Sequence, residues 1–232
     1  LSLKSGKYIF ESIKSFLNKN NKISEEWNSL NLINENASSV GSFDLGIYKT
    51  LDGYNKILVD LEDHKYEIVY LLGQDSLKFK KLNEFIIYQG SHGDKGAEIA
   101  DIVLPGATYT EQNSYYTNLE GKLQKAYKAS YPPGEAKEDW QIINELSEVI
   151  LQKKLFKDKV ELESSMINYI NLFKENNFSK KNSNISDLNF ISENIIPSKI
   201  DYYYSNVIAR ASKTMNDCRN EKINMKITVN NN

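Results

Sequence analysis

The sequence predicts an α/β fold in which a layered, mostly parallel sheet has flanking helices and is followed by a helical and irregular carboxy-terminal extension. Two short apolar runs, at residues 85–88 and 102–104, are rich in β-branched and aromatic residues and have the length of buried strands. A short crossover separates them, which is typical of a layered α/β arrangement. We expect the α/β domain at residues 1–151 and the extension, packed on it, at residues 152–232.

The first third of the chain is predicted to supply helices and one more strand. Apolar residues at helical spacing indicate an amphipathic helix over residues 6–18, packed on the sheet. Residues 27–32 are expected to begin another helix, and residues 51–61 are loosely amphipathic. The apolar run at residues 67–72, which Gly73 ends, predicts a central parallel strand buried on both faces.

Glycine and proline divide the region after residue 88. Three glycines within residues 90–96 predict a tight loop, and residues 97–100 are expected to form a short helical turn. Pro105 stops the next strand because proline has no N–H for the ladder. Residues 108–121 are polar and aromatic, and we expect them to cross the end of the sheet as a loop. The turn positions in that loop are Asn118 and Gly121.

The region after residue 131 is predicted to be mainly helical. Two prolines followed by Gly134 interrupt the chain, and the acids after them suit the start of a helix over residues 135–151. A second amphipathic helix is expected at residues 160–173, followed by a loop or linker at residues 176–184. The apolar side chains expected to face inward are Trp140, Ile143, Leu146, Val149 and Ile150 in the first helix, and Val160, Ile167, Ile170 and Phe173 in the second.

The last part of the chain is predicted to end in a helix and a tail. After Pro197, three consecutive tyrosines at residues 202–204 lead into the helix. The tail after about residue 226 is expected to be disordered, because chain ends are poorly ordered unless they are tied down. The residues expected on one face of the helix are Ile208, Ala211, Met215 and Cys218.

Charge and hydropathy exclude two classes of protein. The 232 residues include 29 basic and 31 acidic side chains, so a net charge of −2 gives no basic face for a nucleic acid. No apolar run reaches the roughly 18 residues that a membrane-spanning helix needs, so we expect no direct membrane span.

The scarcity of metal-binding side chains argues against a metal or cluster in this chain. A single cysteine, Cys218, cannot form an internal disulfide or supply the thiolates of an iron–sulfur cluster. We expect it to be a small buried residue on a helix face. His64 and His92 have no nearby cysteine or second histidine at ligand spacing, so a zinc site is not expected either.

Two residue groups around the glycine loop resemble functional motifs. The stretch from Gly90 to Gly96 could bind a nucleotide through its backbone N–H groups, but it matches neither of the usual phosphate-loop patterns, and we favour a structural turn. Ser91, His92 and Asp94 are too close in sequence to form a catalytic relay without special backbone geometry, so we interpret their proximity as coincidence.

A third group contains carboxylates near the expected carboxyl end of a strand, where α/β proteins commonly bind ligands. Thr110 and Glu111, together with Glu120, could include a general acid or base. We favour loop carboxylates that accept backbone hydrogen bonds. We therefore assign no catalytic, cofactor-binding or metal-binding residue.

The central block carries a family resemblance. The segment QGSHGDKGAEIADIVLPGATYTEQNSYYTNLEGKLQ, at residues 89–124, is similar to the carboxy-terminal part of the large iron–sulfur subunits of respiratory complex I, the NADH:ubiquinone oxidoreductase. Within it, ADIVLPGATYTE and NLEGKLQ resemble the wider molybdopterin oxidoreductase superfamily. Residues 27–47, 132–148 and 208–218 match in the same order, whereas residues 152–205 match poorly. By this resemblance, residues 40–45 form an extended segment or turn.

The resemblance implies a structural role in a respiratory enzyme. This portion is expected to support electron transfer from NADH to ubiquinone, coupled to proton translocation, without a redox centre of its own. Iron–sulfur clusters and FMN are expected elsewhere in the complex. The implied partners are the cluster-bearing amino-terminal half of the same subunit and other peripheral-arm subunits. The implied location is the matrix side of the mitochondrial inner membrane, or the cytoplasmic side of a bacterial membrane.

The amino terminus and the composition add an expectation about the gene. The chain begins Leu1-Ser2-Leu3, partway through the family pattern, and we interpret it as one product of a split gene. The abundance of Asn, Lys, Ile and Tyr suggests an AT-rich genome, either of a protist or of an organelle. Two other interpretations stay open: a fragment of an active molybdopterin-dependent oxidoreductase, whose relatives bind a pterin nucleotide near such glycine loops, and a free-standing binding module.

Overall fold

The computed structural model describes residues 5–24, 27–34, 37, 39–47, 51–74, 80–93, 95–177, 189–192, 194 and 201–230, with the backbone alone at 51–55, 172–177 and 224–230. The chain forms two compact units, one of residues 6–190 and one of residues 1–5 with 191–232. The predicted boundary at residue 151 differs from this division, because the helix that begins at Lys159 packs within the first unit.

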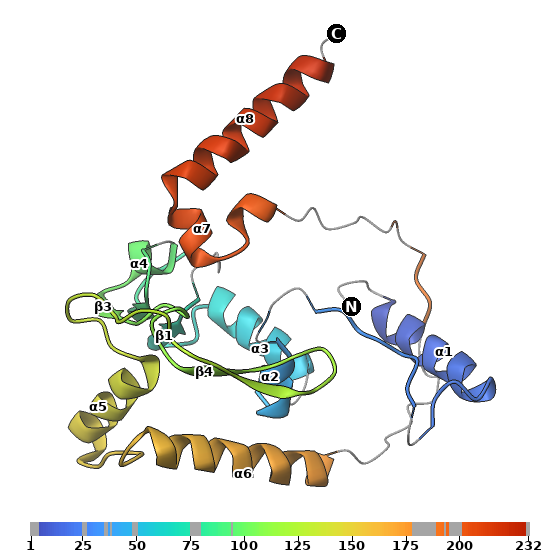
Figure 1. Cartoon of the computed structure of the whole chain (residues 1–232), viewed down its shortest axis with the longest axis horizontal. Helices are drawn as coiled ribbons and strands as arrows, with labels where there is room; N and C mark the ends of the chain where they lie inside the picture. Colours follow the sequence, from blue (N-terminus) through green and yellow to red (C-terminus); the bar gives the residue numbers. More distant parts are fainter. Residues whose placement is uncertain are drawn as a thin grey trace. The chain divides into compact units, whose positions relative to one another are not determined.

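The first unit contains a three-stranded parallel sheet (Figure 1). Its strands are β1 (Ile68–Leu72), β2 (Phe85–Gly90) and β3 (Ile102–Pro105), in the order β1-β2-β3. Both strand pairs are parallel, and the short helix α4 (Lys95–Ile99) connects β2 to β3. The predicted α/β class, the crossover turn and all three strands are therefore confirmed.

The burial of the strands differs from the prediction, because β2 is the central strand and β1 is an edge strand. On β1, Ile68 and Leu72 are exposed, and on β3 both Ile102 and Val103 are exposed. A β-branched run predicts a strand but not its neighbours, so the expected burial of these two strands was wrong. The buried core consists of Leu71, Ile86 and Tyr88, against which Val69, Ala97, Ile99 and Ala100 pack.

The elements before the sheet are helical in three places. Helix α1 (Gly6–Lys19) confirms the predicted amphipathic helix, and its Tyr8 ring packs on Phe190 with centroids 5.6 Å apart. Helix α3 (Leu51–Glu62) precedes β1. Helix α2 (Ser39–Asp44) replaces the extended segment that family resemblance implied.

The helix predicted to begin within residues 27–32 does not form. Instead, Ile23 and Asn28 make an isolated antiparallel bridge. Polar side chains compete with helical hydrogen bonds here, since Ser24 Oγ accepts from Trp27 N at 3.0 Å and Asn28 Oδ1 accepts from Leu30 N at 2.9 Å.

The predicted loop after β3 contains a strand. Strand β4 (Ser114–Thr117) pairs antiparallel with β5 (Leu123–Ala126) to form a hairpin. The predicted turn positions are confirmed: Asn118 Oδ1 accepts from Lys122 N at 2.9 Å, and Gly121 has a φ of 80°, a left-handed conformation that favours glycine.

Helices α5 (Asp139–Leu151) and α6 (Lys159–Asn177) complete the first unit. Both predicted helices exist, although the first begins four residues later than expected, and residues 178–184 of the predicted loop lie outside the described residues. The predicted inward stripes are partly wrong. On α5, Ile142, Asn144 and Ser147 are buried, whereas Val149 and Ile150 are exposed. On α6, Ile170 is buried, whereas Val160 and Ile167 are exposed. The Phe173 side chain is not among the described ones.

The second unit contains the 3₁₀ helix η2 (Tyr202–Tyr204), α7 (Val207–Ala211) and α8 (Lys213–Asn230). The single predicted helix is interrupted at Ser212, whose backbone is extended. Helix α8 continues past residue 226 to Asn230, and residues 231–232 of the predicted tail lie outside the described residues. Cys218 is exposed, so its predicted burial was wrong. None of the described helices is long and apolar enough to cross a membrane.

Candidate functional site

A polar cluster occupies the carboxyl end of the parallel sheet, the usual position of ligand sites in α/β folds. Gln89, near the end of β2, is 0% exposed. Its Oε1 accepts a hydrogen bond from the Tyr70 hydroxyl, and its Nε2 donates to Asp139 Oδ1 at 2.8 Å and to the Asp139 carbonyl at 3.3 Å. All the hydrogen-bonding atoms of the Gln89 amide group therefore have partners within the chain.

Asp139 reaches this position because the chain before α5 is tied to the sheet. Lys137 N donates to the Pro105 carbonyl at 3.2 Å, and Ala107 N donates to the Lys137 carbonyl at 2.7 Å. A Cβ on Gly106 would lie 2.9 Å from Asp139 Oδ1, so a larger residue here would require the Asp139 carboxylate to shift. The other carboxylate oxygen, Asp139 Oδ2, accepts from Gln112 Nε2 at 3.2 Å.

This environment changes the acidity of one tyrosine. Burial raises the pKa of Tyr70, and the negative charge of Asp139 raises it further. The neutral phenol is therefore stabilised as the donor to Gln89. The cluster of Tyr70, Gln89, Gln112 and Asp139 is suited to holding α5 against the sheet.

The glycine loop encloses a side chain of its own strand. The Tyr88 ring packs against both Gly90 and Gly96. A Cβ on Gly90 would lie 2.6 Å from the closest ring atom, and a Cβ on Gly96 would lie 2.7 Å from the closest ring atom. The Tyr88 hydroxyl donates to the His92 carbonyl at 2.8 Å. These two glycines therefore accommodate an aromatic ring, which explains their positions without a bound phosphate.

A pterin nucleotide, which the fold family implies as a cofactor, does not fit this edge as the described residues build it. Gly90 and Gly96 face the Tyr88 ring and Gly106 faces Asp139, and the Gln89 amide is satisfied internally. The negative charge of Asp139 would repel a phosphate. Thr108 Oγ1 is buried without a hydrogen-bond partner among the described residues, but one neutral hydroxyl does not form a phosphate site.

The other candidates from the sequence lie apart. Ser91 Oγ and His92 Nδ1 are 3.0 Å apart, while Asp94 lies outside the described residues. Glu111 precedes β4 and its Oε2 accepts from Thr108 N at 3.1 Å, whereas Glu120 is exposed in the turn at the other end of β4. Thr110 uses its carbonyl to accept from Ala129 N at 2.8 Å.

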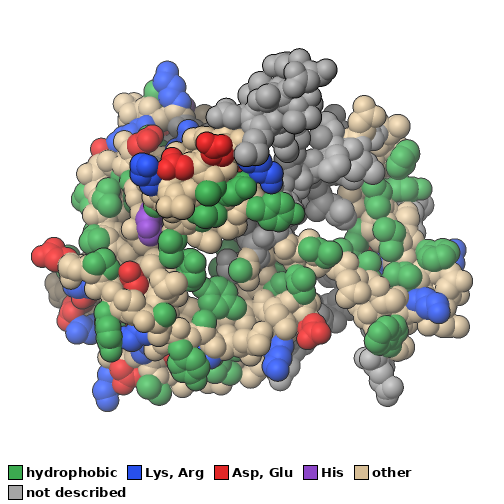
Figure 2. Space-filling model, turned by 45° about the horizontal axis from the view of Figure 1, so that its top comes forward, with side chains coloured by type: hydrophobic (Ala, Val, Ile, Leu, Met, Phe, Trp, Pro, Cys, Tyr) green, Lys and Arg blue, Asp and Glu red, His purple; other side chains and the backbone are tan. Residues whose placement is uncertain are grey.

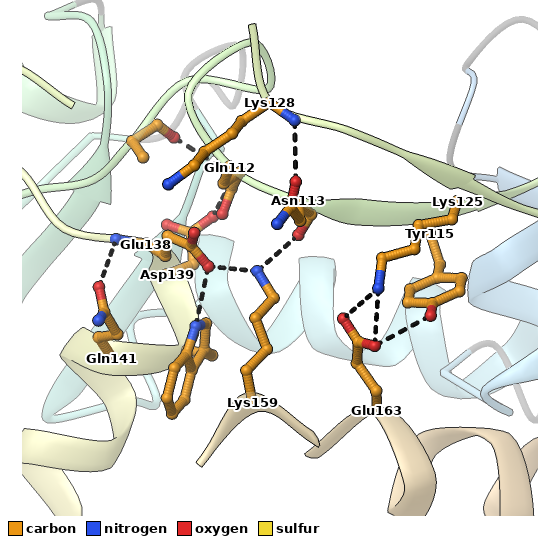
Figure 3. A network of polar contacts seen from close by, with 12 residues as sticks. Gln112, Asn113, Tyr115, Lys125, Lys128, Glu138, Asp139, Gln141, Lys159 and Glu163 are labelled. Carbon is orange, nitrogen blue, oxygen red and sulfur yellow. Dashed lines mark hydrogen bonds and ion pairs between the residues drawn. The ribbon is translucent and has the colours of Figure 1, made fainter. Parts of the chain in front are cut away.

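A second polar network links the hairpin, α5 and α6 (Figure 3). Glu138 Oε2 accepts from Lys159 Nζ and, at 3.0 Å, from Trp140 Nε1. Lys159 Nζ also donates to the Asn113 carbonyl at 2.8 Å. Glu163 on α6 accepts from Lys125 Nζ at 2.9 Å and from the Tyr115 hydroxyl at 3.0 Å. The Lys125 ammonium group, and secondarily the Tyr115 hydroxyl, hold the pKa of Glu163 below its ordinary value, against an opposing effect of burial.

A cavity of about 540 Å³ lies beside this network. Its walls come from the segment before α3, from β4 and from both α5 and α6, and they are mostly apolar and aromatic. The apolar residues that line it include Leu45, Trp140, Phe156, Leu162, Met166 and Tyr169.

Sequence reasoning missed the cluster at the sheet edge. A glutamine directly after the apolar run of β2 is a weak signal, and Asp139 was not singled out among the acids expected at the start of a helix. The two residues are 50 positions apart, so neither motif spacing nor periodicity connects them.

The parallel sheet, its crossover helix and its polar carboxyl edge define a layered α/β protein, a class that commonly binds ligands at that edge. Residues 1–149 match the molybdopterin oxidoreductase family. The chain belongs to that family.

Individual relatives agree with the resemblance seen in the sequence. The chain is 35% identical over 220 residues to the NADH-ubiquinone oxidoreductase 75 kDa subunit of Reclinomonas americana, covering 92% of this chain and 32% of that protein. It is 38% identical over 227 residues to an NADH-quinone oxidoreductase subunit of Rickettsia bellii, covering 95% and 32%. The chain is 34% identical over 232 residues to the mitochondrial 78 kDa subunit of NADH-ubiquinone oxidoreductase from Candida albicans, covering 93% of this chain and 31% of that protein. The chain thus spans about a third of the length of these relatives.

Proposed function

We propose that this chain is the carboxy-terminal, structural portion of the large iron–sulfur subunit of an NADH:ubiquinone oxidoreductase, and that it has no redox centre. The observation that carries this proposal is the closed sheet edge. Gln89 and Asp139 occupy the position where an α/β protein of this class would hold its ligand, and they satisfy each other there. The edge therefore serves packing.

The distribution of cysteine supports the same proposal. An iron–sulfur cluster is usually held by four cysteine thiolates, and the whole sequence has one cysteine. The clusters and FMN would then be carried by other parts of the complex. Among these are the cluster-bearing amino-terminal half of the subunit and the other subunits of the peripheral arm. This arm would lie on the matrix side of the mitochondrial inner membrane, or on the cytoplasmic side of a bacterial membrane.

Native separation of detergent-solubilised membranes tests this proposal. We expect mass spectrometry to find the chain in a large band that has NADH dehydrogenase activity, together with the cluster-binding cysteines of the large subunit. Finding the chain only as a small species outside the active band would overturn the proposed role and favour a free-standing binding module.

The family match favours one alternative, an active molybdopterin-dependent oxidoreductase. Metal analysis of the chain purified from its native source separates the two. We expect no molybdenum or tungsten above background. Either metal at about one atom per chain would overturn the structural role.

A further inference from the structure

Exposed apolar side chains are spread widely over the described part of the chain, so exposure alone does not identify a binding site. On the face drawn in Figure 2 they lie among polar and charged groups. Val149 on α5 is 79% exposed, for example, and Tyr127 after β5 is 76% exposed. The cavity beside the network of α5 and α6 differs from such positions, because aromatic and aliphatic side chains of several elements converge on it.

Two aromatic residues of the cavity walls are held in place by hydrogen bonds. Trp140, in the first turn of α5, donates from Nε1 to Glu138 Oε2 at 3.0 Å. The buried side chain of Asn144 fixes the backbone of Phe156 through two bonds. Its Nδ2 donates to the Phe156 carbonyl at 2.9 Å, and its Oδ1 accepts from Phe156 N at 3.0 Å. These walls are therefore preformed, which lowers the cost of binding a ligand.

The charged side chains around the cavity have partners within the chain. Lys159 pairs with Glu138, and Glu163 pairs with Lys125. The Asp139 carboxylate accepts hydrogen bonds from two glutamine side chains. A charged ligand would lose its hydration here without gaining an unused partner of opposite charge. The cavity therefore favours a neutral ligand.

The size of the cavity also limits what can occupy it. Its volume is about 540 Å³, within the usual range of small-molecule sites. An apolar cavity of about 150 Å³ already holds one benzene molecule. A single aromatic side chain from another polypeptide would thus fill only a part of the space. A longer peptide segment would bring backbone N–H and C=O groups that need partners, whereas the walls are mostly apolar.

We propose that this cavity binds a neutral aromatic small molecule of about two or three rings. The rings contact Trp140 of α5 together with Met166 and Tyr169 of α6. Aromatic pairs gain stabilisation beyond the area that they bury, and a methionine sulfur makes favourable contacts with a ring. The site is separate from the parallel sheet, and it would exist whether or not the chain belongs to a respiratory enzyme.

Photolabelling tests the proposal on the chain in the assembly in which it is purified from its native source. The probe is trifluoromethyl phenyldiazirine, a neutral aromatic molecule that inserts into nearby bonds on irradiation. We expect peptide mass spectrometry to find more label on Trp140, Phe156 and Met166 than on Val149, which is more exposed but does not line the cavity. Equal labelling of Val149, or no label on the three wall residues, would overturn the proposal. A protein segment that fills the cavity in the assembly gives the second of these results.

Competition during the same labelling tests the chemistry of the ligand. Excess naphthalene, a neutral two-ring molecule, should remove the label from the wall residues. Benzoate and benzyltrimethylammonium carry opposite charges on one ring, and neither should compete at the same concentration. Competition by either ion as strong as that by naphthalene would contradict a neutral site, and failure of naphthalene to compete would contradict a specific one.

Two adjacent serines of α6 provide a matched pair of variants. Both are exposed, but Ser165 lines the cavity whereas Ser164 does not. Ser165→Phe places a ring at the cavity and should reduce the label on Trp140 to the level of Val149, whereas Ser164→Phe should leave it unchanged. Circular dichroism of both variants should match the parent chain. Unchanged labelling in Ser165→Phe, or equal loss in both variants, would refute the site. The naphthalene competition needs no substitution, so it decides the question even if Ser165→Phe does not fold.

Discussion

The two units of the chain are stabilised by different interactions. Among the described residues, every buried hydrophobic side chain lies in the unit of residues 6–190, including Ile86, Tyr88 and Ile170. The described part of the other unit depends on polar contacts at its surface, such as Arg219 Nε with Asp201 Oδ2 at 2.6 Å. Exposed ion pairs contribute little to stability, whereas apolar burial contributes much more. Substitutions in the two units should therefore differ sharply in effect.

The largest effect is expected for Ile86→Ala. Ile86 is 0% exposed at the centre of the core, so its truncation should lower the free energy of unfolding by about 2–5 kcal/mol. Urea denaturation followed by circular dichroism measures the change. The control Val149→Ala, at a position 79% exposed, should stay within about 0.5 kcal/mol of the parent. Equal effects of the two substitutions would refute the core assignment.

The next largest effect is expected for Gly96→Ala. A Cβ at this position would lie 2.7 Å from both the Gln74 carbonyl oxygen and the Tyr88 ring, and such overpacking should cost about 1–3 kcal/mol. Gly93→Ala is the matched control in the same loop, because its Cβ would meet nothing closer than 4.0 Å. Thermal or urea unfolding of both variants measures the difference. If Gly93→Ala proves the more destabilising, Tyr88 does not determine the loop.

Loss of the carboxylate at the sheet edge should also destabilise the first unit. Asp139→Ala removes the charged 2.8 Å partner of the fully buried Gln89 Nε2 and leaves it only the carbonyl of residue 139 at 3.3 Å; loss of a hydrogen bond to a charged group should cost about 1–3 kcal/mol. Glu148→Ala removes an exposed carboxylate from the same helix and should be nearly neutral. Hydrogen exchange should show faster opening of β2 in Asp139→Ala alone. Unchanged protection there would mean that α5 does not stabilise the edge.

A smaller effect is expected on mild acidification. The pKa of Glu84 lies below its ordinary value of 4.5. The main cause is hydrogen bonds from backbone N–H groups, chiefly that of Leu82, and His64 is a secondary cause. The Ile86 N–H and the Lys81 ammonium hold the pKa of Asp101 below 3.8. Both carboxylates have a lower pKa in the folded chain than in the unfolded chain. Their contribution to stability is therefore complete at a pH above the unfolded pKa values, and it is lost as the pH falls through the folded pKa values.

The urea midpoint of the first unit should therefore be nearly constant above pH 4.5 and should fall below it. Asp101→Asn should reduce the slope in acid, because one titrating group is removed. A midpoint that rises on acidification would show that these carboxylates do not stabilise the fold.

The smallest effect is expected for Arg219→Ala in the second unit. The guanidinium also lies over the Tyr204 ring, 4.7 Å from its centroid, but both members of the ion pair are partly solvated. The urea midpoint of the first unit should not change. Hydrogen exchange should become faster at the start of α8 and in η2 only. A shift in the unfolding of β2 would show that the two units are coupled.

The sequence predicts the parts of the fold that depend on local pattern. The three strands, the crossover turn, α1 and α3 all follow from apolar runs and periodicity. Strand order does not, and for this reason β1 was wrongly expected at the centre. Short α2 was missed because six residues carry too little periodicity.

The candidate site was predictable only in part, for a related reason. The glycine loop was interpreted as a structural turn because its spacing matched no phosphate motif, and the packing of Tyr88 gives that turn a physical cause. The bond between Gln89 and Asp139 depends on two residues brought together by the tertiary fold. Nothing in either local segment indicates the other.

The bond between Gln89 and Asp139 also has a consequence for the order of folding. During synthesis, β2 emerges 50 residues before the aspartate that satisfies its buried amide. Until residue 139 arrives, the central strand carries an unsatisfied polar group at its end, so we expect the sheet to mature late. Pulse-labelling hydrogen exchange during refolding should find β2 protected together with the start of α5. Protection of β2 well before α5 would contradict this order.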